Sequence, residues 1–154
     1  MATAYSTAGI LVKYCVGAAA TRPTSSYTEI PGVKTIPALG TDVNALQCTP
    51  LSEIFAHHYV NGLRDSGGAL GLTVNDYGAM RDAWASCVSA YENMASTSAM
   101  YWEFTAPNGS GMDSFFFKGK PVELGYGGAD VDSVLENTCN IMPEGGFTFA
   151  SAST

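Results

Sequence analysis

The chain has 154 residues and a formal net charge of −7; 46% of its residues are hydrophobic and only 14% are charged. Intrinsic disorder is excluded, because it requires low hydrophobicity together with high charge, and this length suits one domain. The composition also argues against tight binding of nucleic acid, since the seven Lys and Arg residues are scattered and form no basic patch against phosphates. We therefore expect residues 1–154 to fold as a single domain.

The first third of the chain predicts short strands joined by loops. Residues 1–9 are small and polar and predict a flexible N-terminal arm. Residues 10–16 (Ile-Leu-Val-Lys-Tyr-Cys-Val) are rich in residues that favour β-structure and predict the first strand. Further strands are expected at 27–30 and 44–49, and residues 33–40 are expected to be extended or looped.

Residues 50–68 are the hardest segment to assign, because no helical or strand period dominates them. Turn chemistry occurs at Asn61-Gly62 and again at 65–68, so we interpret the segment as a long excursion with one turn of helix near 53–56. Its apolar content is too high for a disordered loop and requires another surface to lie against.

One amphipathic helix is predicted at 76–94. Its large apolar residues recur at steps of three and four and so form one stripe: Tyr77, Met80, Trp84, Cys87, Val88 and Tyr91. Asn75 is the expected N-cap, and Asp76 suits the positive end of the helix dipole. Nothing else in the sequence indicates a long helix, so strands must cover the apolar stripe.

The rest of the chain predicts strands around this helix. A strand at 69–75 precedes the helix, and a strand at 99–105 follows it. Three more strands are expected, the first of them antiparallel to 99–105, with a turn at 143–146 and a polar tail: 114–118, 132–142 and 147–149. The expected fold class is therefore mainly β, a sandwich or barrel with one flanking α-helix.

A search for chemistry in the sequence assigns no catalytic, cofactor-binding or metal-binding residue. His57 and His58 are adjacent, so their side chains diverge on a strand or a helix and do not share one metal. The four cysteines are widely spaced, and we interpret them as buried free thiols of a reducing compartment, with two disulfides left open: Cys15, Cys48, Cys87 and Cys139. No signal peptide or membrane span is expected. This profile favours a subunit of an assembly over a catalyst.

A family resemblance is carried by the order and spacing of motifs, none of which is specific alone. In chain order they are Thr28-Glu-Ile-Pro-Gly-Val33, Tyr59-Val-Asn-Gly-Leu-Arg-Asp-Ser-Gly-Gly68, Leu70-Gly-Leu-Thr-Val-Asn75, Tyr101-Trp-Glu-Phe-Thr-Ala-Pro-Asn-Gly109, Phe115-Phe-Phe-Lys-Gly119 and Asn140-Ile-Met-Pro-Glu-Gly145. Over about residues 8–150 this order resembles the major tail tube protein of long, non-contractile-tailed (siphovirus-type) bacteriophages.

The resemblance implies hexameric rings that stack into a hollow tube, through which the genome passes during delivery. It also implies a protein of the virion tail, assembled in the host cytoplasm, with no cofactor and no membrane partner. Its partners would be copies of itself and the tape-measure, tail-terminator and tail-tip proteins, while DNA would pass without specific binding. Carried onto this chain, the resemblance makes 50–68 the stacking loop and makes 1–9 and 147–154 bridging arms.

The candidate site residues follow from this assignment. The candidates for contacts between rings or subunits lie in the 50–68 segment: Glu53, Ile54, Phe55, His57, His58, Tyr59, Val60, Leu63 and Arg64. The candidates for the lumen are polar residues, and the acidic ones among them would repel DNA: Glu103, Glu123, Glu136, Thr138 and Asn140.

Two other interpretations stay open on the sequence alone. The first is the tube protein of a contractile tail or of a bacterial secretion system, whose fold is similar. The second belongs to a different class, a monomeric ligand-binding β-barrel or small enzyme. It predicts a deep polar pocket and a lasting monomer.

Overall fold

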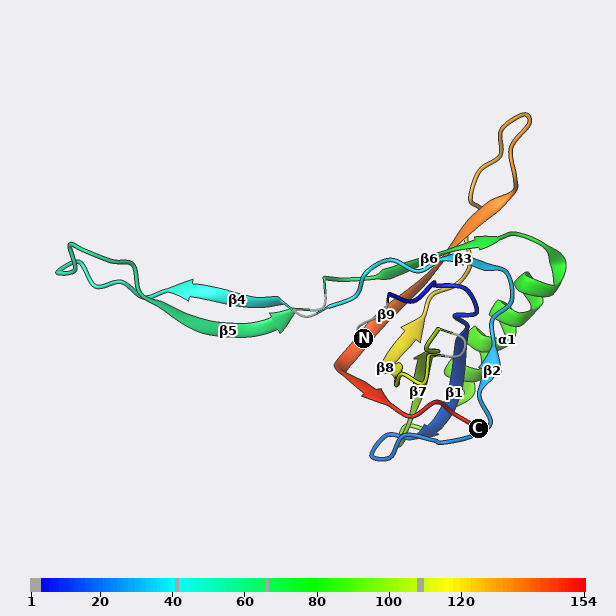
Figure 1. The fold of residues 1–154 in the computed structure, drawn as a ribbon, viewed down its shortest axis with the longest axis horizontal. Coiled ribbons are helices and arrows are strands. Elements are labelled where there is room, and N and C mark those ends of the chain that lie inside the picture. The colour runs from blue at the N-terminus through cyan, green and yellow to red at the C-terminus, as the bar shows by residue number, and fades with distance from the viewer. Residues whose placement is uncertain (1–3, 41, 66, 108–109) are drawn as a thin grey trace. The chain divides into compact units, whose positions relative to one another are not determined.

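The computed structural model describes residues 4–40, 42–65, 67–107 and 110–154. Contacts divide the chain into two compact units, one made of residues 1–37 with 69–154 and the other of residues 38–68. The larger unit is a curled sheet that forms half of a barrel and carries the helix (Figure 1). The smaller unit is a two-stranded hairpin.

The larger unit is built on one seven-stranded sheet, in which every neighbouring pair of strands is antiparallel. The strand order is β2-β1-β7-β8-β9-β6-β3, so two very short strands form the edges. The strands are β1 (Val12–Ala18), β2 (Thr28–Glu29), β3 (Val33–Thr35), β6 (Leu70–Asn75), β7 (Ser98–Phe104), β8 (Ser114–Pro121) and β9 (Glu136–Ala150). The prediction of a mainly β fold with a single helix is confirmed for the described residues.

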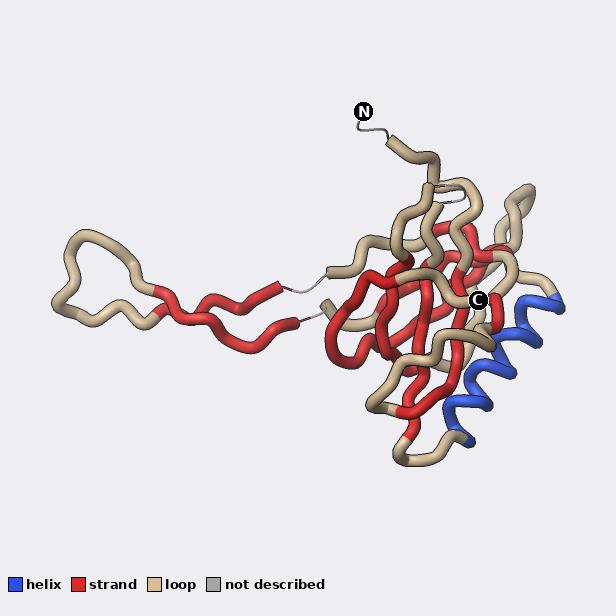
Figure 2. The backbone as a smooth tube through the Cα atoms, turned by 60° about the horizontal axis from the view of Figure 1, so that its bottom comes forward, coloured by secondary structure: helices blue, strands red, loops and turns tan. Residues whose placement is uncertain are grey.

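The helix α1 (Gly78–Asn93) lies along one face of this sheet (Figure 2). Its Met80, Trp84 and Cys87 are buried, which confirms the centre of the predicted apolar stripe. Tyr77, the first predicted member, instead precedes the helix and is 44% exposed. The indole ring of Trp84 lies 5.8 Å from that of Trp102 on β7, and its Nε1 donates a hydrogen bond to the carbonyl of Val122 at 2.8 Å. Burial of these two large rings between helix and sheet stabilises the core.

The start of the helix differs from the prediction. Asn75 is not the N-cap, because β6 continues through it and pairs it with Glu136 of β9. The backbone N–H of Asp76 then donates to the carbonyl of Leu135 at 3.0 Å. Tyr77 takes the N-cap position without a side-chain hydrogen bond, so sheet pairing overrides the local capping preference.

Asp76 is held by an ion pair rather than by the helix dipole. Its carboxylate is fully buried and accepts hydrogen bonds from Nε and Nη2 of Arg81, the second at 2.8 Å. Asn137 Nδ2 approaches the same carboxylate at 3.5 Å. Hydrogen bonding from Arg81 lowers the pKa of Asp76 below its usual range, so the carboxylate stays charged in the folded chain.

The lowered pKa of Asp76 predicts an acid-sensitive contribution to stability. This contribution is complete above the unfolded-state pKa, about 3.9, and is lost as the pH falls through the lower folded-state pKa. We expect Asp76→Asn to flatten the fall of the urea midpoint below about pH 4 relative to the unmodified chain. Asp82→Asn, on the exposed side of α1, is the matched control. An unchanged acid dependence in Asp76→Asn would contradict the assigned ion pair.

A single strand, β9, lies where the sequence predicted two strands and a turn. The expected strand at 132–142, turn at 143–146 and strand at 147–149 are wrong in their bounds, because β9 runs unbroken over Glu136–Ala150. Its pairing with β8 shifts by two residues between Phe116↔Thr148 and Lys118↔Glu144. Pro143 therefore pairs in register with Gly119 of β8, and the glycines after Glu144 lie where the register shifts within the strand.

The smaller unit pairs β4 (Asp42–Gln47) with β5 (Tyr59–Asp65) in antiparallel register. The strand predicted at 44–49 is present but begins and ends two residues earlier, and 7 of the 19 residues of the expected 50–68 loop form a strand themselves. The predicted helical turn at 53–56 is wrong. In its place the carboxylate of Glu53 accepts a hydrogen bond from the N–H of Phe55 at 2.9 Å, a local bond that competes with helix formation.

Candidate functional site

The hairpin presents an apolar surface that its own two strands leave uncovered. Phe55 is 90% exposed and Leu63 is 89% exposed, and Ile54, Tyr59 and Val60 are exposed as well. Leu51, whose side chain is fully exposed, also belongs to this surface and was not among the predicted contact residues. The side chain of Arg64, another contact candidate, lies outside the described part of the chain.

Polar contacts give the tip of the hairpin a defined shape. Glu53 Oε2 lies 3.2 Å from Nε2 of His58, while Gln47 Nε2 lies 2.8 Å from Nδ1 of His57. The hydrogen bond from the Phe55 N–H lowers the pKa of Glu53. These bonds tie the charged and polar groups to one another and leave Ile54 and Phe55 exposed at the tip.

Three lumen candidates lie together on the sheet face that points away from α1. Glu136, Thr138 and Asn140 alternate along β9 with Cys139 and Ile141, which are buried. Thr138 is exposed, Asn140 is half-buried, and Glu136 forms an ion pair with Lys34. The fourth candidate, Glu123, is exposed in the loop after β8.

The fifth lumen candidate, Glu103, is corrected by the structure. It points to the same side as the others but is completely buried. Both of its carboxylate oxygens accept hydrogen bonds from Ser153, one from the backbone N–H at 3.1 Å and one from the hydroxyl. Thr154 N–H donates to the carbonyl of Thr24 at 3.1 Å. The C-terminal tail therefore covers Glu103 in the folded chain.

The contact between Ser153 and Glu103 predicts that the tail contributes to stability. Ser153→Ala removes one donor from a buried carboxylate and is expected to cost about 1.5–3 kcal/mol in urea unfolding. Ser151→Ala, in the exposed part of the same tail, is the control and is expected to change little. Equal effects of the two substitutions would show that the hydroxyl of Ser153 has no special role.

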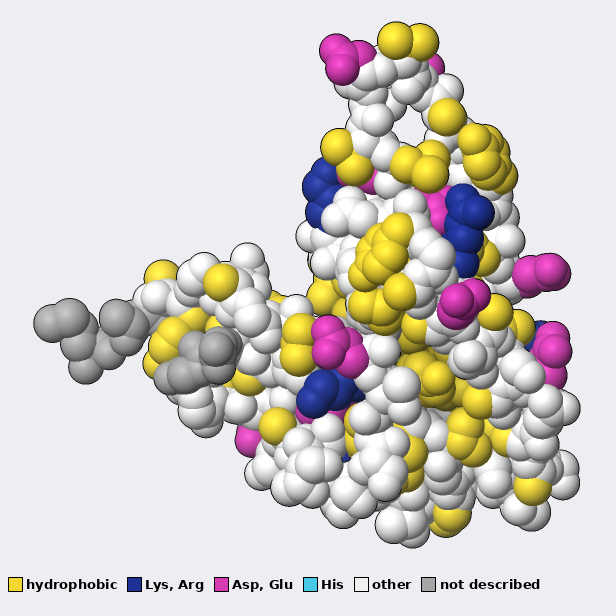
Figure 3. Space-filling model, turned by 90° about the vertical axis from the view of Figure 1, so that its right-hand side faces the viewer, with side chains coloured by type: hydrophobic (Ala, Val, Ile, Leu, Met, Phe, Trp, Pro, Cys, Tyr) yellow, Lys and Arg dark blue, Asp and Glu magenta, His cyan; other side chains and the backbone are white. Residues whose placement is uncertain are grey.

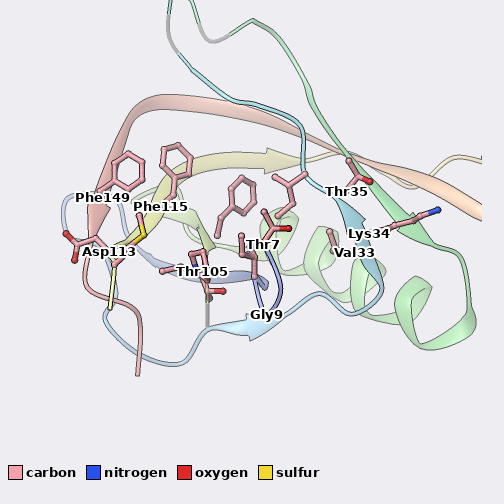
Figure 4. A pocket seen from close by; sticks show the side chains of 15 residues that line it. Thr7, Gly9, Val33, Lys34, Thr35, Thr105, Asp113, Phe115 and Phe149 are labelled. Atoms are coloured by element: carbon pink, nitrogen blue, oxygen red, sulfur yellow. The ribbon is translucent and has the colours of Figure 1, made fainter. Parts of the chain in front are cut away.

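A hollow of about 710 Å³ opens where the N-terminal arm and β3 meet the ends of β7, β8 and β9. Figure 4 shows Phe115 and Phe149 on one wall, with Lys34 on the opposite side. The ring of Phe115 lies 5.9 Å from Phe104 and 5.2 Å from Phe149. The lining of the hollow is mainly apolar, and it also includes Lys34, Asp113 and three threonines.

The loop between β8 and β9 projects from the larger unit and carries acidic and apolar side chains at its end (Figure 3). Val131 is 98% exposed, and Asp130 and Asp132 are exposed beside it. Its neck is closed because Asn137 Nδ2 donates to the carbonyl of Gly125 at 2.7 Å. Gly127 approaches the carbonyl of Glu136 so closely that a Cβ there would lie 2.2 Å from the oxygen.

The chain offers few groups for chemistry. Among the described residues, no three His, Cys, Asp or Glu side chains gather closely enough to hold a metal ion. All four cysteines are free thiols, and burial raises the pKa of Cys139 to about 12. Cys48 is exposed, which corrects the expectation that every thiol is buried. No described helix is long and apolar enough to span a membrane.

No family model and no curated protein sequence matches the chain. Solved structures do match it over almost its whole length. A chain of the anti-feeding prophage (AFP) baseplate, symmetrised six-fold, has a TM-score of 0.67 at 13% identity, with 100% of both chains covered. A chain of the native gene transfer agent (GTA) virion has a TM-score of 0.60 at 10% identity and covers 96% of this chain and 100% of its own.

A chain of the empty GTA particle tail, refined with C6 symmetry, is similar to the same degree. Its TM-score is 0.60 at 12% identity, and it too covers 96% of this chain and 100% of its own. At these identities the likeness establishes the fold, which is thus that of chains from phage-derived tail and baseplate particles.

Proposed function

We propose that this chain is a structural subunit of a phage-type tail tube. Six copies form a ring, and rings stack into a hollow conduit through which DNA passes for delivery. The observation that supports this most is the match of the entire fold to chains of six-fold symmetric tail and baseplate particles. Such a chain is a protein of the virion tail and acts by assembly rather than by catalysis.

The hairpin supplies the contacts that hold successive rings together in this proposal. Its exposed apolar residues support this role, because contiguous apolar patches on a protein surface mark sites of contact with a partner. The shared polar bonds at the tip keep Ile54 and Phe55 presented outward. The contact candidates are therefore kept as inter-ring contacts: Glu53, Ile54, Phe55, His57, His58, Tyr59, Val60, Leu63 and Arg64.

The sheet face with Glu136, Thr138 and Asn140 lines the lumen in this proposal. Its hydroxyl and amide groups contact hydrated DNA without the basic groups that would hold phosphates. Glu123 lies beside α1, where it lines a hollow with Arg81 and Trp84, so it does not belong to this face. Glu103 is left out because it is buried. Copies of this chain are the main partners, with tape-measure, tail-terminator and tail-tip proteins at the ends of the tube.

A second candidate function is a ring of the baseplate or of the tube end, rather than the repeating tube. Chains of the AFP baseplate and of the AFP tube-terminating cap are similar in fold to this chain, and this similarity favours the second candidate. The two functions differ in whether the chain polymerises alone. A repeating tube subunit extends without limit, whereas an end ring stops after one or two layers.

Size-exclusion chromatography followed by negative-stain microscopy of the purified chain tests the proposal. Hollow filaments with six-fold end views are the expected result for a tube subunit, whereas isolated rings support the second candidate. Because tube subunits can require a nucleus, the same chain is also mixed with tail-tip complexes. A lasting monomer under both conditions would overturn the assembly function.

A further inference from the structure

The sheet face that points away from α1 is open over β9 but covered over β7 and β8. Thr138 of β9 is exposed on this face. Glu103 of β7 and Phe116 of β8 form a cross-strand pair on the same face, yet they are 0% and 1% exposed. Two segments lie over this pair, residues 19–27 between β1 and β2 and residues 151–154 after β9. We call these two segments together the cover.

Residues 19–27 are packed against the sheet through the ring of Phe116. The guanidinium carbon of Arg22 lies 3.8 Å from the centroid of this ring, and the ring of Tyr27 meets it edge-on at 6.0 Å. The hydroxyl of Tyr27 donates to the carbonyl of Pro23 at 3.0 Å, and burial raises the pKa of Tyr27 to about 12. This segment is therefore a packed layer over Phe116 rather than a free loop.

Residues 151–154 connect this layer to β7. The backbone N–H and the hydroxyl of Ser153 each donate to one oxygen of the Glu103 carboxylate. The N–H and the hydroxyl of Thr154 both donate to the carbonyl of Thr24, at 3.1 Å and 3.3 Å. All four donors of these two residues are thus used within one chain, where they join the two segments of the cover.

The strand that precedes the tail also favours its closed position. Ala150 pairs in register with Ser114 of β8, and from there the tail runs toward β2 (Figure 1). Opening the tail alone would leave the Glu103 carboxylate beneath residues 19–27 without its two donors, which is unfavourable for a buried acceptor. The contacts of the chain with itself therefore favour a closed tail over a free one.

We propose that residues 151–154 act within their own chain, as a strap that closes the cover over Glu103, and do not reach a neighbouring copy. The strap keeps this acidic group off the surface. The inference goes beyond the proposed function, because it concerns contacts within a single copy. It also differs from the bridging arm that the family resemblance implies for 147–154.

Cross-linking between positions 24 and 154 tests the strap. All chains carry Cys15→Ser and Cys48→Ser, which removes the thiols that are not buried. One chain carries both Thr24→Cys and Thr154→Cys, and the backbone hydrogen bond between these exposed positions is retained. The matched control is an equal mixture of chains that carry only one of the two cysteines. A short bis-maleimide is added before and after assembly, and intact mass and a denaturing gel separate links within a chain from links between chains.

The expected result is a link within the double variant that is at least about ten-fold more abundant than the heterodimer of the mixture, because one chain holds both thiols close together. Heterodimer in equal amount, before assembly or only in filaments, would overturn the strap and leave the tube function standing. Absence of any link would also overturn it. Links within the chain in preparations that never form rings or filaments would support the strap and count against the tube.

Amide hydrogen exchange of the unmodified chain, followed by nuclear magnetic resonance, provides a second measurement that needs no substitution. The amides of Ser153 and Thr154 are expected to exchange at least about ten-fold more slowly than that of the exposed Ser151, because both donate hydrogen bonds in the closed strap. Equal exchange at the three positions would show that the tail is free, and the strap would be overturned.

Discussion

Replacing residues 49–57 with Asn-Gly is expected to abolish assembly while leaving the larger unit folded. Cys48 and His58 already face each other across the hairpin, and a two-residue Asn-Gly turn closes such a pair. The variant loses Leu51, Ile54 and Phe55, the exposed residues assigned to the contact between rings. We expect filaments to disappear in negative-stain images, with a melting temperature close to that of the unmodified monomer.

The matched control for this deletion keeps the length of the tip and changes only its apolar side chains. Ile54→Ser with Phe55→Ser retains the Glu53 contacts to the Phe55 N–H and to His58. It is expected to weaken assembly in the same direction, which separates side-chain docking from simple loss of reach. Filaments of normal length in the shortened variant would show that the hairpin is not the stacking element.

Trp84→Ala is expected to lower the free energy of unfolding by about 3–5 kcal/mol, the usual cost of removing a large buried aromatic side chain. The indole is 1% exposed, packs on Trp102 and donates to the carbonyl of Val122. Its loss leaves a cavity between helix and sheet and an unpaired carbonyl. Urea unfolding followed by circular dichroism measures the change.

Ala85→Ser, one residue further along α1 and exposed, serves as the control for the Trp84 substitution. This substitution changes an exposed side chain of the helix. Its free energy of unfolding is expected to stay within about 0.5 kcal/mol of that of the unmodified chain. A loss below about 1 kcal/mol for Trp84→Ala would mean that the helix does not contribute to the core in this way.

Much of the fold could be predicted because its strongest elements have local signals. The apolar stripe of α1 and the strand around Trp102 were located within about two residues by periodicity alone. The hairpin was harder, because Asn61-Gly62 has the composition of a turn. In the structure a Cβ on Gly62 would lie 2.6 Å from the carbonyl of Asn44, so this glycine allows close approach of β4 within a strand.

The site depends on contacts that no local pattern contains. Alternation along β7 placed Glu103 on the correct side of the sheet, but the residue that buries it, Ser153, lies 50 positions further along the chain. The hollow likewise joins residues near 7–10, 33–36 and 104–115 with Phe149. Periodicity reports which way a side chain points, whereas its exposure depends on which distant segment crosses it.

The closed neck of the β8–β9 loop makes this loop a practical place for a reporter. Gly125 and Asn137 hold the two ends of the loop together, so a fluorescent domain or epitope inserted between Val131 and Asp132 would begin and end at neighbouring points. Exposed loop tips of this kind tolerate insertions well. A label fused after Thr154 would instead extend from a residue hydrogen-bonded to Thr24, next to the cover of Glu103. Imaging of tube growth in real time is therefore better served by an internal label than by a terminal one.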